Sequence, residues 1–242
     1  MNPDILAVLF TYDRYELLKE SLETMFRNPG LSFRLWVIDN GSIFENKTLD
    51  GERQLNLLLE YYRAGKIESL ILNPRNFGCN HAVNQLMAQA KLTSINPPIA
   101  TPEFIFQTND DMVYEDNWLL ETYNTYMTLE STEKVTIVSP FHCKHLNGHI
   151  SHGMDTIKKV NIAGTKYEIK KNVSGNTWFM RGATWIHFFD WWPVNHPTEG
   201  GDWEKLYKNT GMGFSCAVTP VEMVHHMPDS QGTGKFNRLG HW

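Results

Sequence analysis

The stretch Ile5-Leu-Ala-Val-Leu-Phe10 is a continuous apolar run, and the polar sequence Thr11-Tyr-Asp-Arg14 follows it directly. A run of this length without a polar residue is typical of a strand that is buried on both faces, as in a parallel sheet. Apolar residues at helical spacing come next, and Asp13 with Glu16 three residues later has the pattern of a capping box. We therefore expect a buried strand, a short polar loop and a helix with Asp13 as its N-cap.

The same unit of strand and helix recurs along the first 140 residues. The further strands predicted there lie at Phe33–Ile38, Ile67–Leu72, Phe104–Phe106 and Val135–Val138. Amphipathic helices separate them, with apolar residues at helical spacing around residues 55–62, 83–90 and 118–127. Strands that alternate with helices imply right-handed crossovers and a parallel sheet with helices on both faces.

After residue 140 the alternation ends. Short apolar runs there predict antiparallel or mixed strands at Tyr167–Ile169 and Thr177–Met180. A helix from about Trp203 to Asn209 and a last strand at Phe214–Thr219 are predicted to follow. The predicted fold class is α/β, with one domain over residues 1–242. Its first half, residues 1–140, contains the mostly parallel sheet flanked by helices. Its other half, residues 141–242, contains the mixed or antiparallel portion and a C-terminal lid.

The composition limits the classes of protein to which the chain can belong. Of its 242 residues, 41% are hydrophobic and 20% are charged, which is typical of a globular protein. The formal net charge of −5 argues against a surface that coats nucleic acid. The three cysteines are widely spaced and form no C-x-x-C motif, which favours a reducing compartment. No apolar stretch reaches the length of a signal peptide or a membrane span, so we expect a cytoplasmic protein.

Polar residues follow each of the first four strands. They are Thr11–Arg14, Asp39–Asn40, Arg75–Asn76 and Asn109–Asp111. In open α/β sheets, ligands bind beyond the carboxyl ends of the strands, so these four loops are expected to form one binding site. The alternative is that loops are generally polar and that Asp and Asn form turns. Four such loops in succession favour the binding site.

Asn109-Asp110-Asp111 is the most specific of these loops. Adjacent carboxylates at the end of a strand repel each other unless a cation or hydrogen-bond donors compensate them. Carboxylate oxygens are the ligands that Mg²⁺ and Mn²⁺ prefer, and either ion can bridge to a diphosphate. The alternative is a helix N-cap region, because Asp116 and Asn117 follow, although a cap requires only one acid. The sequence therefore predicts a site for Mn²⁺ or Mg²⁺ here.

The pair His225-His226 is the second candidate for metal binding, because an imidazole can complete a site that a carboxylate begins. The segment after it contains two glycines, Lys235 and Arg238, which predicts a lid whose basic side chains close on phosphates. The alternative is a surface pair of histidines followed by a loose C-terminus. Asp202 also has two interpretations, as the N-cap of a helix or as a functional acid.

Together these segments resemble the family 2 glycosyltransferases of the GT-A fold. Thr11-Tyr-Asp-Arg14 resembles the opening T-Y-N-R motif of that family, and Val37-Ile-Asp-Asn-Gly-Ser42 resembles its V-V-D-N-G-S motif. Asn73-Pro-Arg-Asn-Phe-Gly78 is similar to the N-x-x-N-x-G motif. Phe106-Gln-Thr-Asn-Asp-Asp111 is similar to the strand that ends in the family's DxD motif.

The resemblance extends into the second half of the chain. Trp178-Phe-Met-Arg181 resembles the acceptor-side strand, Gly201-Asp202-Trp-Glu204 the E-D motif, and Val224-His-His226 the late metal-binding histidine. The sequence departs from the family pattern at two places. Asn109 occupies the first position of the DxD motif, and Gly201 stands where an acid usually precedes the catalytic aspartate.

The resemblance implies that residues 1–140 are the nucleotide-sugar-binding half and that residues 141–242 are the acceptor-side half. It implies a nucleotide-sugar donor, with a UDP-sugar favoured, at the carboxyl edge of the sheet. It implies that Asp39 accepts a hydrogen bond from the base, that Arg75 faces the base or the diphosphate, and that Asp110 holds the ribose or the sugar. Asp111 and one histidine of the pair at 225 and 226 would bind the metal. The other residues expected to contact the substrates are Thr11, Tyr12, Asp13, Arg14, Asn40, Gly78, Asn109, Trp178, Lys235 and Arg238.

The resemblance also implies the reaction. Asp202 would be the general base that takes a proton from an acceptor hydroxyl, and a single displacement would invert the configuration at the anomeric carbon. The acceptor is a glycan, a protein or a modified nucleobase. Two alternatives stay open. A nucleotide-sugar-binding module without catalysis is favoured by Gly201, and a sugar-1-phosphate nucleotidyltransferase is disfavoured because Thr11–Arg14 contains no glycine.

Trp178 belongs to an aromatic-rich segment that also contains Trp185 and Trp203. Aromatic faces stack on sugar rings or on bases, but a group of this kind more often packs in a core. The sequence leaves both interpretations open for Trp178.

Overall fold

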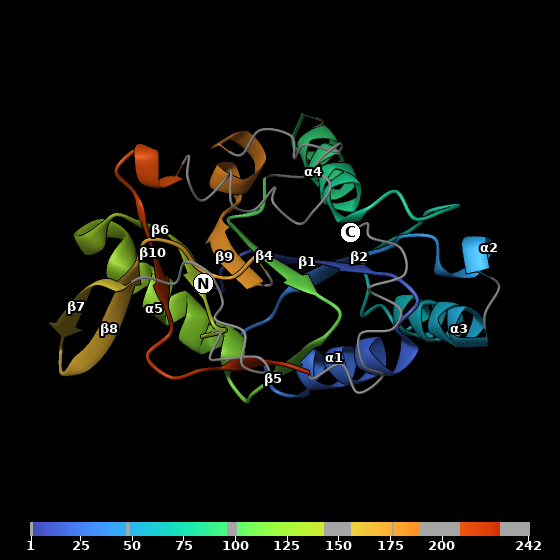
Figure 1. Ribbon diagram of the computed structural model, residues 1–242, viewed down its shortest axis with the longest axis horizontal. Coiled ribbons are helices and arrows are strands. Elements are labelled where there is room, and N and C mark those ends of the chain that lie inside the picture. Colours follow the sequence, from blue (N-terminus) through green and yellow to red (C-terminus); the bar gives the residue numbers. More distant parts are fainter. Residues whose placement is uncertain are drawn as a thin grey trace.

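A computed structural model describes residues 2–46, 49–95, 101–142, 156–175, 177–188 and 209–227 of the chain. Figure 1 shows a twisted central sheet with helices on both sides. The strands of this described part are β1 (Ile5–Thr11), β2 (Arg34–Asp39), β3 (Ser69–Leu72), β4 (Phe104–Asn109), β5 (Met112–Tyr114), β6 (Val135–Ser139), β7 (Thr156–Ile162), β8 (Thr165–Lys170), β9 (Thr177–Arg181), β10 (Ser215–Val218) and β11 (Val224–His226). The helices are α1 (Tyr15–Arg27), α2 (Ser42–Asn46), α3 (Leu49–Arg63), α4 (Cys79–Ile95), α5 (Trp118–Glu133) and the π-helical turn η1 (Thr184–Phe188). None of these helices has the length and apolar character required to cross a bilayer.

Nine of the described strands form one sheet in the order β3-β2-β1-β4-β9-β6-β10-β8-β7. Strands β3, β2, β1 and β4 are parallel to one another, as the alternation of strands and helices predicts. Strand β9 is antiparallel to β4 and β6, whereas β10 is parallel to β6 and antiparallel to β8. The prediction of an α/β fold with a mixed portion is therefore confirmed. The hairpin β7–β8 forms the edge opposite β3 (Figure 1).

Two apolar layers cover the sheet, and β1 contributes to both. Successive side chains of a strand point to opposite faces. Ile5 and Leu9 pack in the layer that contains α1, α3 and α5, whereas Leu6 and Phe10 pack in the layer that contains α4 and η1. No residue of β1 is exposed. Burial on both faces explains why the opening strand is an uninterrupted apolar run.

The start of α1 differs from the sequence prediction. Its N-cap is Arg14 rather than Asp13, and no side chain caps its first amide groups. The predicted capping box of Asp13 and Glu16 was therefore wrong. Asp13 instead adopts a left-handed backbone conformation with φ of 49°. The amides of Asp13 and Arg14, which precede the helix, donate to Ser42 and Gln54, as described below.

Three strands were not predicted from the sequence, namely β5, β7 and β11. Strands β5 and β11 have three residues each, which is too short for a periodic pattern to be visible. They pair antiparallel in a separate two-stranded sheet, and β5 packs against α1 (Figure 1). The run at Phe214–Thr219 contains β10, but β11 follows it, so it is not the last strand. The helix predicted from about Trp203 to Asn209 lies almost wholly outside the described residues.

Candidate active site at the carboxyl edge of the sheet

The carboxyl ends of β1, β2, β3 and β4 lie together at one edge of the sheet. The strand register pairs Thr11 with Asp39 and Phe10 with Asn109. Beyond the strands, the amide of Asn73 donates to the carbonyl of Asp39 at 2.8 Å. The loops that follow these four strands are therefore neighbours, as a parallel sheet requires.

Two adjacent acids, Asp110 and Asp111, are buried at the end of β4. The Arg14 guanidinium bridges them, with Nη1 lying 3.3 Å from Asp110 Oδ1 and 2.9 Å from Asp111 Oδ2. The Thr11 hydroxyl donates to Asp110 Oδ2 at 2.6 Å. These donors come from the loop after β1. Residues 11–14 and 110–111 thus form one charged cluster, although about 100 residues of sequence separate them.

His226 joins this cluster from β11. The register pairs His226 with Met112 and His225 with Val113, and the amide of Met227 donates to the carbonyl of Asp111 at 2.8 Å. His226 Nε2 lies 3.1 Å from Asp111 Oδ2. Because successive side chains of a strand point in opposite directions, His225 turns away. Its Nε2 lies 3.1 Å from Glu115 Oε1, so only His226 of the pair contacts the acids.

Burial and the neighbouring opposite charges shift the pKa values of Asp110, Asp111 and His226 in opposite directions. For Asp110, burial is the largest influence, and with the charge of Asp111 it outweighs Arg14 and raises the pKa to about 6. Burial also acts to raise the pKa of Asp111, but the hydrogen bond and charge of His226, together with Arg14, lower it below its ordinary value. Burial acts to lower the pKa of His226, but the hydrogen bond with Asp111 raises it. Perturbed neighbouring acids of this kind are typical of functional sites.

The residues of this cluster fit a divalent cation in part. The described residues contain no group of three or more His, Cys, Asp or Glu side chains that could hold a metal, but Asp111 and His226 are an acid and an imidazole side by side. Asp111 Oδ1 is buried and accepts no hydrogen bond from any described residue. Mg²⁺ is commonly bound by one or two carboxylates, with phosphate oxygens and water completing its shell. Asp111 and His226 are therefore the residues that would hold Mn²⁺ or Mg²⁺ here.

Asp39, at the end of β2, is a third buried carboxylate at the same edge, and neutral donors surround it. Its Oδ1 accepts from the amides of Gly41 and Ser42 at 3.0 and 2.7 Å, and its Oδ2 accepts from Gln54 Nε2 at 2.7 Å. A carboxylate can accept about four hydrogen bonds. Three are accounted for here, so Asp39 retains the capacity to accept one more from a ligand.

The loop after β3 is locked to the loop after β2. Asn40 Nδ2 donates to Asn76 Oδ1 at 2.7 Å, and Asn40 Oδ1 accepts from Asn73 Nδ2 at 3.0 Å. Gly41 has φ of 101°, and a Cβ atom there would collide with the backbone of residues 75 and 76. Arg75 is exposed, and its guanidinium lies 4.8 Å from the centre of the Phe77 ring. Asn40 and Gly41 therefore hold the two loops together.

The remaining predicted site residues divide into three groups. Tyr12, Asp13, Gly78 and Asn109 lie in the loops of this edge and are partly buried. Trp178 has no exposed surface, and its indole donates to the Ser174 carbonyl at 2.7 Å. It packs beside α4 in the core, as the packing interpretation holds, and it presents no face to a substrate. Asp202, Lys235 and Arg238 lie outside the described residues.

Sequence reasoning missed two residues that organise this edge, Ser42 and Gln54. The signal for Gln54 is its place on α3, three residues after Gly51 and four before Leu58. All three are buried. A polar side chain on the buried face of an amphipathic helix requires hydrogen-bond partners. That requirement points to Gln54 as a contact of a neighbouring loop, without identifying which one.

Comparisons with known proteins show the family and the fold of the chain. The sequence profile described as "Glycosyl transferase family 2" matches residues 7–188. A search of curated protein sequences found no match. Among solved structures, TarS 1–349 from S. aureus in complex with UDP-GlcNAc is 14% identical, with a TM-score of 0.61 over 91% of this chain and 57% of that chain.

Two further solved structures are similar. The mannosyltransferase PcManGT from Pyrobaculum calidifontis, in complex with GDP-Man and Mn²⁺, is 15% identical, with a TM-score of 0.56 over 92% of this chain and 56% of that chain. GalNAc-T7 with UDP, GalNAc and Mn²⁺ is 11% identical, with a TM-score of 0.64 over 93% of this chain and 44% of that chain. At this identity the likeness shows the fold. The chain spans between 44% and 57% of the length of these three structures.

Proposed function

This chain belongs to glycosyl transferase family 2, and from that membership we propose that it transfers a sugar from a nucleoside-diphosphate-sugar to an acceptor hydroxyl, with metal assistance and inversion at the anomeric carbon. The observation that carries the proposal is the contact between Asp111 and His226, whose Oδ2 and Nε2 lie 3.1 Å apart. Two short strands, β5 and β11, bring these residues together across 115 positions of sequence. An acid and an imidazole beside a nucleotide-binding edge are what a metal-assisted transferase requires.

The donor is proposed to lie along the carboxyl edge, with its base at Asp39 and its diphosphate near Asp111. Asp39 has one remaining acceptor position, which suits the N3–H group of uracil, although guanine also offers a donor. We favour a UDP-sugar. The structures of TarS with UDP-GlcNAc and of GalNAc-T7 with UDP support uracil, whereas PcManGT with GDP-Man keeps guanine as the rival base.

The chain's own groups prepare this site for a charged ligand. Arg14 and His226 offset the negative charge of Asp110 and Asp111, so the acids stay together at the edge before a ligand arrives. When bound at Asp111 and His226, a divalent ion supplies charge stabilisation to the departing nucleoside diphosphate. Asp202 is proposed as the general base for the acceptor hydroxyl. Lys235 and Arg238 are proposed to close on the phosphates.

A thermal-shift screen tests the donor site. UDP, dTDP, GDP and CMP are each added with and without Mn²⁺, and the melting temperature of the protein is measured. We expect the largest increase with UDP and Mn²⁺ together, because a diphosphate and the two protein ligands share the ion. An increase with nucleotide alone and no further change with Mn²⁺ would reject the metal role. No increase with any nucleotide would reject the donor site.

The substitution Asp202→Asn tests the base. We expect sugar transfer to fall about 10²- to 10⁴-fold, as the loss of a general base does, while the affinity for UDP stays close to that of the wild type. Asp116→Asn is the matched control, since Asp116 pairs with Arg27 on an exposed surface. Transfer at the wild-type rate by the Asp202 variant would exclude Asp202 as the base.

A specific observation favours a second candidate, a nucleotide-sugar-binding module without transfer. Gly201 stands beside Asp202 in place of an acid. The two functions differ in whether nucleoside diphosphate is released. Incubation of the protein with a nucleotide-sugar and measurement of free nucleoside diphosphate separates them, because a binding module retains the sugar nucleotide intact.

A further inference from the structure

Gln54 is a completely buried amide on α3 that contacts both loops of the proposed donor site. Its Nε2 donates to Asp39 Oδ2 and to Ser42 Oγ, each at 2.7 Å. Its Oε1 accepts from the amide of Arg14 at 2.9 Å. An amide whose oxygen must face a backbone N–H has its nitrogen on the other side, so these partners fix the orientation of the side chain.

These hydrogen bonds surround a backbone conformation that is costly by itself. Asp13 has φ of 49°, in the left-handed region that residues other than glycine rarely adopt. Such a conformation persists only where the surroundings determine it. The amide of Asp13 donates to Ser42 Oγ at 2.8 Å, and the next amide, of Arg14, donates to Gln54. Ser42 and Gln54 therefore hold the turn on both sides.

The turn determines where the Arg14 side chain lies. With its amide held by Gln54, Arg14 extends its guanidinium to Asp110 and Asp111. The other end of the Gln54 amide holds Asp39. Gln54 thus connects two parts of the proposed donor site. One part is Asp39, which is proposed to bind the base. The other is the loop with Arg14, which bridges the two acids proposed to lie near the metal and the diphosphate.

We propose that Gln54 is a positioning residue of the donor site, which keeps Asp39 and the turn at residues 11–14 in fixed relative positions before the nucleotide binds. The inference rests on the proposed function and extends it to a residue outside the motifs of the sequence. Its physical basis is preorganisation: a carboxylate that is already oriented loses little freedom when a ligand binds. Two backbone amides already donate to Asp39 Oδ1, and Gln54 donates to Asp39 Oδ2. Gln54 therefore also determines which acceptor position on Oδ2 stays free for the base.

The competing interpretation is that Gln54 only contributes to the stability of the fold. The two interpretations differ in what they predict for a variant that remains folded. Loss of a merely structural amide lowers the melting temperature and leaves nucleotide affinity unchanged in the folded fraction. Loss of a positioning residue lowers nucleotide affinity in protein that is fully folded at the temperature of the measurement.

The first test is Gln54→Met, which removes both the donor and the acceptor at similar volume. We expect the affinity for UDP in the presence of Mn²⁺, measured by calorimetry, to fall about 10- to 100-fold, the range found when a supporting partner of a site residue is lost. Gln89→Met is the matched control. Gln89 is a partly buried glutamine on α4 that donates to Ser69 at 2.7 Å, at the start of β3 and away from the carboxyl edge.

The second test is Gln54→Glu, and it uses pH. The introduced carboxyl group can accept from the Arg14 amide, but when ionised it cannot donate to Asp39. Two neighbouring buried carboxylates raise the pKa of the pair, and protonation restores a donor between them. We therefore expect UDP affinity to be weak at about pH 8 and to recover at least tenfold towards about pH 6. The affinity is compared with that of the wild type and of Gln89→Met at each pH, because Asp110 and His226 have raised pKa values in all three proteins. The recovery towards low pH is expected only for Gln54→Glu relative to these two proteins.

The outcomes separate this inference from the proposed function. Wild-type protein that binds no nucleotide would overturn the proposed function and this inference with it. Wild-type binding, combined with unchanged UDP affinity in folded Gln54→Met, would overturn the role of Gln54 alone. If Gln54→Met does not fold, the pH profile of Gln54→Glu decides: a profile parallel to that of the wild type contradicts the inference, and recovery at low pH supports it.

Discussion

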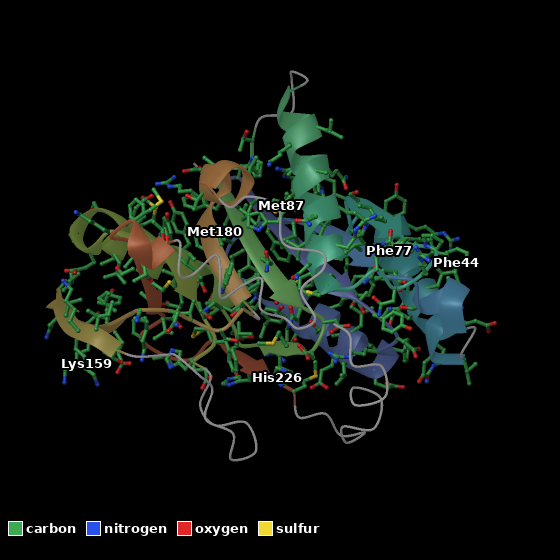
Figure 2. The ribbon with its side chains drawn as sticks, turned by 45° about the horizontal axis from the view of Figure 1, so that its top comes forward. Phe44, Phe77, Met87, Lys159, Met180 and His226 are labelled. Carbon is green, nitrogen blue, oxygen red and sulfur yellow. The ribbon has the colours of Figure 1, made fainter. Side chains whose placement is uncertain are left out.

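Two charged clusters of the molecule have similar composition but very different surroundings. At the carboxyl edge, the Arg14, Asp110 and Asp111 side chains are 11%, 5% and 10% exposed. On the hairpin β7–β8, Glu168 lies 2.9 Å from Lys159 and 2.6 Å from Lys170, and the Glu168 and Lys159 side chains are 36% and 72% exposed. Figure 2 shows Lys159 at one end of the molecule, well separated from His226.

The difference shows which charges are functional candidates. Water reaches Glu168 and Lys159 of the hairpin cluster, although the Lys170 side chain is only 11% exposed, so the ion pair of Glu168 with Lys159 is weak and tolerates substitution. The cluster at the edge has lost most of its hydration, and the charges compensate one another at a high desolvation cost. A group of charges that is buried at such a cost is a candidate for a functional role.

Arg14→Gln should have the largest effect on stability. It leaves Asp110 and Asp111 buried side by side without the cation that bridges them. We expect a loss of about 3 kcal/mol in the free energy of unfolding of the metal-free protein, as when one partner of a buried ion pair is removed. Urea denaturation measures it. The control Arg27→Gln breaks a pair with Asp116 whose side chains are 57% and 59% exposed, and it should cost less than about 1 kcal/mol. Equal losses in the two variants would remove the contrast between buried and exposed charge.

Asp111→Asn should have the largest effect on metal binding. It keeps the shape of the side chain but removes the charge that faces His226. We expect the apparent affinity for Mn²⁺ to fall about a hundredfold or more, since even the partners that support metal ligands are worth 10- to 100-fold. Titration of Mn²⁺ followed by electron paramagnetic resonance measures free and bound ion directly. Asp116→Asn is the control and should bind Mn²⁺ as the wild type does. Retained affinity in the Asp111 variant would place the metal elsewhere.

The position of the acids at the carboxyl edge of the sheet could be predicted from the sequence, and the reason is topological. Apolar strands that alternate with helices give a parallel sheet, and a parallel sheet brings the loops after its strands to one edge. Asp39 and Asp110 therefore could be assigned to one site from sequence alone. A histidine near Asp111 was expected both from metal chemistry and from the family resemblance, but the choice of His226 over His225 could not be made from the sequence.

Other features could not be predicted, because they depend on contacts between distant segments. Strands β5 and β11 have three residues each, and they can be recognised as strands only from their pairing with each other. Asp13 was expected to cap α1 because its sequence neighbours fit a capping box. In the fold, the adjacent amides are held instead by Ser42 and Gln54. Trp178 could equally have stacked on a sugar, and only its position between the sheet and α4 decides for packing.

Thr11→Val should have an intermediate effect. The Thr11 hydroxyl donates to Asp110 at 2.6 Å in a buried environment, and hydrogen bonds to charged groups contribute about 1.5–3 kcal/mol. We expect a loss in this range in urea denaturation. Thr136→Val is the matched control, because Thr136 donates at 2.6 Å to the neutral amide oxygen of Asn209 and should cost only about 0.5–1.5 kcal/mol. A greater loss at Thr136 would show that the charge of Asp110 adds nothing to the Thr11 bond.

Glu168→Gln on the hairpin should have the smallest effect, and pH should reveal it. Hydrogen bonds from Lys170 and then Lys159 lower the pKa of Glu168 from 4.5 to about 2. A carboxyl group with a lowered pKa in the folded state stabilises the protein above its unfolded pKa, and this contribution is lost as the pH falls through the folded pKa. Because the pair is exposed, we expect the wild type to be more stable than the variant by only about 0.2–1 kcal/mol at neutral pH. The difference should shrink between about pH 4.5 and about pH 2.

Salt gives an independent measure of the same interaction. At an ionic strength of about 1 M the screening length is only about 3 Å, so the difference between wild type and Glu168→Gln at neutral pH should nearly disappear. The loss caused by Arg14→Gln should persist in the same salt, because buried pairs are screened much less. If salt reduced both differences to the same extent, the acid pair at the carboxyl edge would be as hydrated in solution as the hairpin. The charges at the carboxyl edge would then not differ from surface charges as candidates for ligand binding.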